Sequence, residues 1–281
     1  MTAAEAYAAK VEATIAQRSG RSQAQGGDRW DRRAAFFRMD PRRALDRNLS
    51  ALAELILPED VVLDIGGGAG RVSLPLALRC REVVNVEPSP GMREQFAASA
   101  AEAGITNARA IDGSWPEAAA TVRGDVSVVA NVTYFVRDIV RFIDGLNAAT
   151  ARLVIVSVWS VPPPSQPAKL HELVFGEPLA MAPSHADLLP VLWELGLLPD
   201  VRALPEAFRA RGLPQTREDA VVNAIANIDA EGHPGARESI EAHFEALYTQ
   251  TEHGFRPLWQ PDVREMLISW APPSGARDSR P

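Results

Sequence analysis

The sequence has little cysteine and no surplus of positive charge, and each shortage excludes a class of function. Cys80 is the single cysteine among 281 residues, so the chain has no internal disulfide and no cysteine-rich zinc site. Its apolar neighbours Leu78 and Val83 predict a buried, unreactive thiol. The formal net charge of −7 argues against a general nucleic-acid-binding protein, because neutralising phosphates needs an excess of Lys and Arg. We therefore expect no nucleic-acid partner.

Metal-binding and membrane-spanning patterns are absent as well. No two histidines are spaced His-x-x-x-His, and we expect no metal site; the histidines are His171, His185, His233, His243 and His253. No signal peptide is visible, and no apolar run approaches the ~20 residues that a transmembrane helix needs. The sequence therefore predicts a cytoplasmic protein without a membrane partner, either a monomer or a homodimer.

The chain does have ample apolar sequence, arranged with an alternating rhythm. Hydrophobic residues make up 46% of it, which is enough for a large core. Strand-like runs are predicted at 61–65, 82–87, 105–111, 125–131 and 152–159, with helical stretches between them at 71–79, 91–103 and 138–149. This order predicts an α/β protein with a parallel sheet covered by helices on both faces.

Helical segments are predicted on either side of this region. Residues 2–18 have helical composition, and Asp40 and Pro41 suit the N-cap and first position of a helix. That helix would carry one apolar stripe, made of Leu45, Leu49, Leu52 and Ile56. Later predictions are a helix at 186–195, a strand at 200–204, a mostly helical insertion at about 216–251 and a last strand at 263–270. Thr216 and Asp219 are set as a capping box. We expect an N-terminal helical extension over 1–57 and a main domain over 58–281, with its insertion at about 206–252.

The most informative segment is 61–70, Val-Val-Leu-Asp-Ile-Gly-Gly-Gly-Ala-Gly. A short β-branched strand ends in an acid, and glycines follow at alternate positions. Without side chains, backbone N–H groups and a helix N-terminus can approach a cofactor closely. A dinucleotide fingerprint, Gly-x-Gly-x-x-Gly, counted from Gly66 would place its third glycine at Arg71. The spacing Asp-x-Gly-x-Gly-x-Gly from Asp64 to Gly70 therefore disfavours a nicotinamide-dependent oxidoreductase.

The next strands end in residues suited to a nucleoside, and ligands of open parallel sheets bind beyond such ends. Glu87 can accept both hydrogen bonds of a ribose diol. The prolines beginning at Pro88 stiffen the turn, and Met92 suits either the adenine or the core. Asp112 can accept from the adenine amine, although Asp-Gly is also an ordinary turn pair. Backbone and a flat apolar surface would come from Gly113, Ser114 and Trp115.

Taken together, these segments resemble the successive motifs of the Rossmann-like (class I) S-adenosylmethionine-dependent methyltransferases, in order and spacing, over about residues 61–159. The resemblance implies a seven-stranded sheet with an antiparallel last strand, S-adenosyl-L-methionine as cofactor and S-adenosyl-L-homocysteine as product. It implies cofactor contacts at Asp64, Gly66, Gly68, Glu87, Asp112 and Asn131. The same loops extend the expected set to Gly67, Gly70, Pro88, Met92, Gly113, Ser114, Trp115 and Val132.

The resemblance also bears on the acceptor of the methyl group. Thr133 and Tyr134 follow Asn131 at the edge that faces the methyl group, where enzymes acting on DNA base amino groups carry Pro-Pro-Tyr/Phe. This difference disfavours such a substrate, and we expect a small-molecule acceptor. A general base is needed only if the acceptor must lose a proton. Tyr134, His171 and His185 are weak candidates, and core packing explains Tyr134 equally well.

Two questions stay open on the sequence alone. An aromatic and basic cluster suits either a lid over the cofactor or ordinary helix packing; it consists of Trp30, Arg33, Phe36 and Phe37.

The alternatives to a small-molecule methyltransferase are a protein of this fold that binds the cofactor without methyl transfer, and a protein or RNA methyltransferase.

Overall fold

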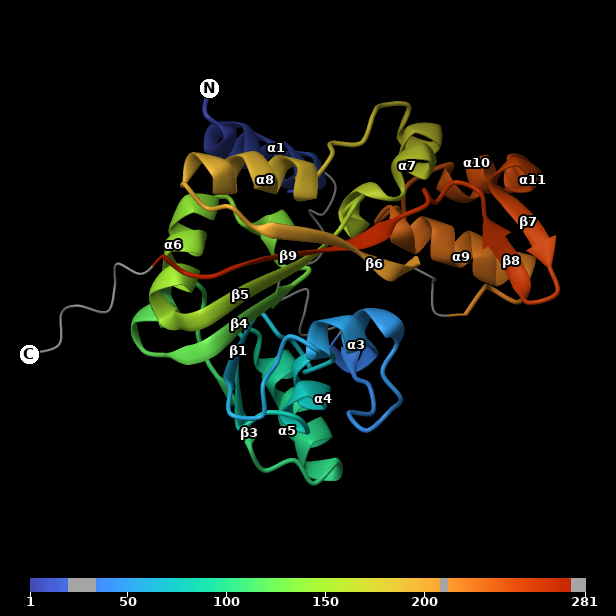
Figure 1. The fold of residues 1–281 in the computed structure, drawn as a ribbon. Coiled ribbons are helices and arrows are strands. Elements are labelled where there is room, and N and C mark those ends of the chain that lie inside the picture. Colours follow the sequence, from blue (N-terminus) through green and yellow to red (C-terminus); the bar gives the residue numbers. More distant parts are fainter. Residues whose placement is uncertain (20–33, 208–211, 274–281) are drawn as a thin grey trace, which may run out of the picture.

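The computed structural model describes residues 1–19, 34–207 and 212–273. Its centre is a seven-stranded sheet ordered β3-β2-β1-β4-β5-β9-β6, in which β9 runs antiparallel to β5 and β6 (Figure 1). The strands are β1 (Val61–Ile65), β2 (Glu82–Val86), β3 (Ala108–Ile111), β4 (Gly124–Ala130), β5 (Thr150–Trp159), β6 (Asp200–Ala207) and β9 (Arg264–Trp270). The expected Rossmann-like class and the antiparallel strand are both confirmed.

Helices cover both faces of the sheet (Figure 1). One face carries α1 (Ala3–Ser19), α6 (Ile139–Ala149) and α8 (His185–Glu194), and the other carries α3 (Arg47–Ala53), α4 (Ser73–Ala77) and α5 (Pro90–Glu102). Short 3-10 segments are η1 (Ala34–Phe37), η2 (Glu117–Ala120), η3 (Thr133–Phe135) and η4 (Pro163–Ser165). Apolar residues of α6 recur at helical spacing and are buried against the sheet, so the sequence pattern accounts for this packing. No helix in the described ranges is both long and apolar enough to cross a membrane.

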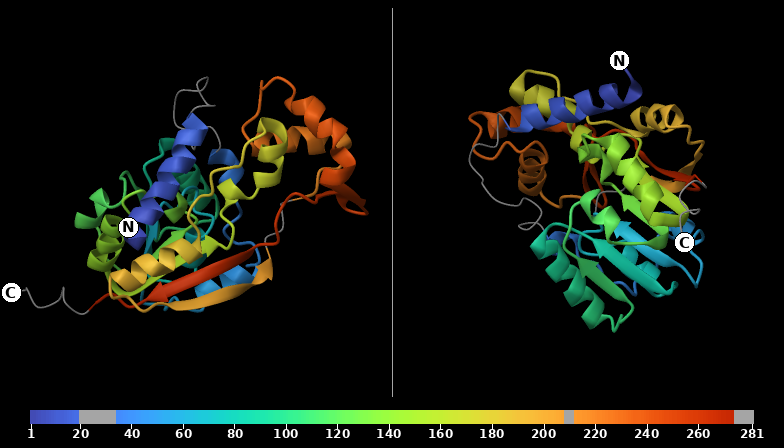
Figure 2. Two further views of the ribbon diagram at one scale, coloured as in Figure 1. Left: turned by 90° about the horizontal axis from the view of Figure 1, so that it is seen from above. Right: turned by 90° about the vertical axis from the view of Figure 1, so that its left-hand side faces the viewer.

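The insertion forms a module with an apolar cluster of its own. It comprises α9 (Arg217–Asn227), α10 (Ala236–Ala242), α11 (Phe244–Leu247), β7 (Tyr248–Thr251) and β8 (Gly254–Pro257), and α7 (Ala168–Phe175), which precedes β6, packs into the same cluster. Thr216 caps α9 as expected, accepting from the Asp219 backbone N–H at 3.0 Å. Because β6 ends and β9 begins at the carboxyl edge of the parallel strands, the module stands beyond that edge (Figure 2).

Two local predictions were wrong. The helix expected from Asp40 begins at Arg47, where Asp46 is the N-cap and accepts from the Leu49 N–H at 2.8 Å. Asp40 instead accepts from the Arg42 N–H at 2.8 Å, and Pro41 fits the turn that results. The apolar stripe is still buried, because burial depends on the sheet beneath it. The β7–β8 hairpin was not predicted, since four-residue strands are too short to show a period of two.

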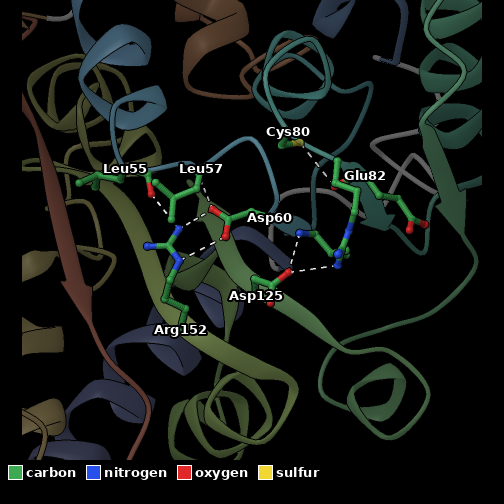
Figure 3. Close-up of polar contacts among 9 residues, drawn as sticks. Leu55, Leu57, Asp60, Cys80, Glu82, Asp125 and Arg152 are labelled. Carbon is green, nitrogen blue, oxygen red and sulfur yellow. Dashed lines mark hydrogen bonds and ion pairs between the residues drawn. The ribbon is translucent and has the colours of Figure 1, made fainter.

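The amino edge of the sheet is held by an ion pair (Figure 3). Asp60, only 2% exposed, accepts from the Leu57 N–H at 2.7 Å and pairs with Arg152, whose Nη2 also donates to the Leu55 carbonyl at 3.0 Å. Cys80 is buried beside this edge, and burial raises the pKa of its thiol to about 11. The thiol is therefore protonated at neutral pH, which agrees with an unreactive cysteine.

Candidate cofactor site

The glycine loop between β1 and α4 is shaped by backbone that only glycine tolerates well. Gly66, Gly68 and Gly70 have φ of 69°, 55° and 80°, in the left-handed region. Gly67 is required for a different reason. A Cβ at this position would lie 2.0 Å from Oδ2 of Asp64. The loop therefore lies directly over the Asp64 carboxylate and exposes its backbone on the other side.

Glu87 fastens this loop to the end of β2. Its carboxylate, 6% exposed, accepts from the Gly68 N–H at 3.0 Å through Oε2 and from the Ser89 N–H at 2.9 Å through Oε1. Asn85 donates from Nδ2 to the Gly68 carbonyl at 2.9 Å. Glu87 and Asn85 together fix the position of Gly68 at the carboxyl end of β2.

Arg93 joins the ends of β2 and β3. Its Nη1 donates to the Glu87 carbonyl at 2.8 Å, to the Pro88 carbonyl at 2.7 Å and to Oδ1 of Asp112 at 3.0 Å. The Asp112 side chain is 74% exposed, so it lies at the surface of the site with room to accept further bonds. Gly113 and Ser114 continue this loop toward η2, where the Ser114 carbonyl accepts from Ala118.

Buried polar atoms without a hydrogen-bond partner gather around the glycine loop. In the described part of the chain they include both carboxylate oxygens of Asp64, Oδ1 of Asn85 and the Ser89 hydroxyl; the Ser73 hydroxyl lies near Asp64 but does not meet hydrogen-bond geometry with it. Such atoms are costly in an apolar interior and are normally satisfied by protein, water or ligand. The chemistry of this set, mostly acceptors around a carboxylate, fits a ligand that brings N–H or O–H donors and positive charge.

Burial raises the pKa of Asp64 to about 6; the Ser73 hydroxyl and Arg71 lower it, and the charge of Glu87 raises it further. In the unfolded chain, the pKa of an aspartate is about 3.9. Between these two pH values the folded state holds a proton that the unfolded state has lost, so stability falls as pH rises from about 4 to about 6 and then levels. This decrease in the free energy of unfolding amounts to roughly 3 kcal/mol, because the pKa is shifted by about two units. We expect the decrease to be absent in Asp64→Asn, which has no carboxyl group at this position.

Urea denaturation of the wild type and of Asp64→Asn, without ligand and at a series of pH values, measures this difference. Parallel stability curves for the two proteins between pH 4 and pH 7 would contradict a raised pKa at Asp64.

The loop after β4 is fixed by two buried tyrosines. Asn131 has a left-handed φ of 63°, which costs energy for a residue with a side chain. Tyr134 donates from its hydroxyl to Oδ1 of Asn131 at 3.0 Å and accepts from the Trp159 N–H. Tyr7 of α1 donates to the Thr133 carbonyl at 2.8 Å. The Val132 side chain lies against Gly66, where an added Cβ would come within 2.8 Å of it. The β4 loop and the glycine loop are therefore in contact.

The three candidate bases have different surroundings. Tyr134 is 1% exposed, and burial raises the pKa of its hydroxyl, so the bonds above favour a positioning role over proton transfer. His171 is 1% exposed in α7, with Nδ1 at 3.0 Å from the Glu177 carbonyl and its ring against Phe175. His185 begins α8, and burial lowers its pKa, which keeps the ring neutral.

Met92 and Trp115, the two apolar residues of the predicted cofactor site, both pack into the protein. Met92, 4% exposed, forms a small cluster with Ala34 of η1 and Ala69 of the glycine loop. Trp115 packs edge-on against Phe142 and donates from Nε1 to the Phe142 carbonyl at 3.1 Å. Met92 thus lies beneath the loop, and a contact of either residue with a cofactor stays a prediction. Of the expected lid cluster, Trp30 and Arg33 lie outside the described residues.

The structure adds residues to the site that the sequence analysis did not single out. Asn85 is a polar residue within the apolar, buried run 83–86 of β2, which is a signal that was available in the sequence. The bonds made by Arg93 and Ser73 depend on the fold and had no comparable signal.

Comparison with known proteins agrees with this geometry. Residues 62–158 match a family model described as a methyltransferase domain, and the match runs from β1 to β5. This chain carries a class I S-adenosylmethionine-dependent methyltransferase domain. No curated protein sequence matches the chain.

Solved structures support the fold of the methyltransferase domain. A candidate methyltransferase from Bacillus halodurans C-125 has a TM-score of 0.55 at 12% identity, covering 82% of this chain and 100% of the other. The YcgJ protein from Bacillus subtilis has a TM-score of 0.50 at 18% identity, covering 81% and 99%. At these identities the likeness concerns the fold alone.

Proposed function

We propose that the methyltransferase domain binds S-adenosyl-L-methionine at the glycine loop and transfers its methyl group to a small-molecule acceptor. The observation that carries the proposal is the Glu87 carboxylate, which holds the Gly68 and Ser89 backbone N–H groups and so ties the glycine loop to the end of β2, at the edge where a ribose would lie. The partnerless polar atoms beside it fit a ligand with several donors and a positive charge.

The residues of the site would hold the cofactor at distinct points. Glu87 would bind the ribose diol, Asp112 the adenine amine, and the backbone of Gly66–Gly70 the amino-acid portion. Asp64, 1% exposed beneath the loop, would act on that portion through its negative charge. The bound sulfonium supplies an already activated methyl group. The protein's contribution is therefore mainly alignment, which can supply on the order of 7–11 kcal/mol of rate acceleration.

The acidic balance of the chain and the sequence Asn-Val-Thr-Tyr after β4 support a small-molecule acceptor over a nucleic acid. Incubating the protein with S-adenosyl-L-methionine and a panel of metabolites, and detecting products by mass, tests transfer. Methylated products together with S-adenosyl-L-homocysteine are expected. Tight cofactor binding with no product from metabolites, proteins or RNA would favour a protein that binds the cofactor without methyl transfer.

We also propose that η1 is part of a lid over the cofactor. Ala34 packs on Ala69 of the glycine loop, while the Phe36 side chain is 79% exposed two residues later. An exposed aromatic ring contributes little to the fold and is available to cover an adenosyl group. Phe36→Ser should therefore weaken S-adenosyl-L-homocysteine binding about tenfold, because part of the apolar surface buried between the ring and the ligand is lost. The melting temperature should not fall.

Isothermal calorimetry on Phe36→Ser and on Leu198→Ser, whose side chain is 86% exposed in the loop before β6, separates a lid from a general surface effect. Point variants are preferable to deleting residues 1–39, because Tyr7 and Val11 of α1 belong to the main core. Equal affinity of wild type and Phe36→Ser would rule out a contribution of this ring.

A further inference from the structure

A second, half-buried carboxylate lies at the carboxyl edge of the sheet. Glu265 is the second residue of β9, opposite Trp159 at the end of β5. Ser157, whose carbonyl accepts from the Asn131 N–H at 2.9 Å, lies two residues before Trp159. The register therefore places Glu265 at the carboxyl edge that also carries the β4 loop, the glycine loop and Glu87, with β5 between Glu265 and β4.

Glu265 is held firmly by neutral partners. Its Oε2 accepts from Nδ2 of Asn48 at 3.0 Å, and its Oε1 accepts from the Ser157 hydroxyl. Asn48 is 8% exposed and Ser157 is 1% exposed, so both donors are fixed by packing. They come from α3 and β5, and each bonds a different oxygen of the carboxylate. This arrangement orients a single carboxylate for contact with a further group.

No cation neutralises Glu265 within residues 1–19, 34–207 and 212–273. Arg264, its neighbour, directs Nη1 to the Pro205 carbonyl, and none of the ion pairs of the described chain includes Glu265. Glu265 lies opposite Trp159, whose backbone N–H donates to the Tyr134 hydroxyl, and burial together with the charge of Glu265 raises the pKa of Tyr134. A half-buried, uncompensated negative charge is costly and is commonly found at functional sites.

We propose that Glu265 is the acceptor-binding carboxylate of this domain, accepting a hydrogen bond from a hydroxyl or amine acceptor and then taking its proton. This inference rests on the proposed function. Each Glu265 oxygen keeps a lone pair beyond those used by Asn48 and Ser157. The negative charge of Glu265 would repel a methyl acceptor that presents a carboxylate. It would attract a methyl acceptor that presents a hydroxyl or an ammonium group.

The proton and electron balance of the transfer is complete with these groups. The acceptor oxygen or nitrogen forms a new bond to the methyl carbon as the carbon–sulfur bond breaks. The electron pair of the broken carbon–sulfur bond stays on sulfur, which becomes a neutral thioether. The hydrogen of the acceptor passes as a proton to Glu265, which releases it to water before the next turnover. No oxidant, reductant or metal is required.

The test uses sinefungin, an adenosyl amino acid with an amine in place of the methyl sulfonium. Because this amine occupies the methyl position, a facing carboxylate should favour it over S-adenosyl-L-homocysteine. Calorimetry on the wild type should show at least tenfold tighter binding of sinefungin. Glu265→Gln, which keeps partners for Asn48 and Ser157, should bring the ratio of the two affinities close to one with S-adenosyl-L-homocysteine affinity unchanged.

Glu54→Gln is the matched control, since it removes the same charge from an exposed position at the end of α3 and should leave the ratio as in the wild type. A wild type without preference for sinefungin, or a preference that survives in Glu265→Gln, would overturn the assignment of Glu265 while leaving the cofactor site intact. Failure of both ligands to bind the wild type would instead refute the proposed function.

Discussion

Glu87→Ala should weaken S-adenosyl-L-homocysteine binding at least 100-fold. The substitution removes the acceptor proposed for both ribose hydroxyls, and hydrogen bonds to a charged group contribute about 1.5–3 kcal/mol each. It also leaves the Gly68 and Ser89 N–H groups, now held at 3.0 and 2.9 Å, without their acceptor. The loop that binds the amino-acid portion would then lose its attachment to β2.

Calorimetric titration of the purified variant measures this loss, and Glu94→Ala is the matched control. Glu94 lies on α5 and is exposed, so its removal changes the net charge equally without touching the site. Circular dichroism confirms that both variants are folded. Affinity within threefold of the wild type in a folded Glu87→Ala would refute the role of Glu87 in binding the ribose.

Gly67→Ala is expected to affect both folding and binding. The added methyl would lie 2.0 Å from Oδ2 of Asp64 and 2.7 Å from Oδ1 of Asn85, both in side chains that are almost fully buried. Neither acceptor can move away without disturbing β1 or β2, so the loop itself must shift. Overpacking of this kind costs about 1–3 kcal/mol of stability. Because the shifted loop no longer presents its N–H groups, we expect at least a 100-fold loss of S-adenosyl-L-homocysteine affinity.

The double variant Asp64→Ala/Gly67→Ala identifies the cause. Removing the Asp64 carboxylate eliminates the closest contact, so most of the stability lost in Gly67→Ala should return, and the two substitutions should be strongly non-additive. Gly104→Ala measures backbone strain without a steric contact, since φ there is 63° and an added Cβ meets nothing within 4 Å. Additive effects in urea denaturation would show that Asp64 is not the group that excludes a side chain from position 67.

The sheet and the cofactor loops were predictable because their signals are local. The run 61–65 has four apolar residues and one acid, Asp64, and Gly66 follows it, which is enough to predict a buried parallel strand and a tight turn. The position of Glu87 follows from the next strand in the same way. Chain order alone then brings these loops to one edge, since right-handed crossovers place the carboxyl ends of parallel strands together.

The interactions that hold these loops were not predictable from such patterns. Tyr7 bonds the Thr133 carbonyl across 126 positions of the chain, and Asn48 reaches Glu265 across 217. No local sequence pattern distinguishes these side chains from their neighbours. Each acquires its role only because the fold brings a distant partner within hydrogen-bond distance. In the sequence, Glu265 is simply a polar residue near the start of a mostly apolar last strand.

Helix boundaries failed for a related reason. Asp40 and Asp46 are both good N-caps, and the sequence does not say which of the two begins the helix. The structure uses Asp46 for the helix and Asp40 for the preceding turn, because residues 38–43 must run along the glycine-loop side of the sheet. Arg38 bonds the Ser99 hydroxyl at 3.0 Å, and Arg43 bonds the Arg71 carbonyl at 2.8 Å.

The most direct test of the account is a calorimetric titration of the full chain with S-adenosyl-L-homocysteine, beside an identical titration with NADH. A glycine loop fastened by Glu87 predicts saturable, one-site binding of S-adenosyl-L-homocysteine in the micromolar range, about −8 kcal/mol, and no heat from NADH. Absence of binding at millimolar S-adenosyl-L-homocysteine, or saturable binding of NADH in its place, would contradict the assignment of this site.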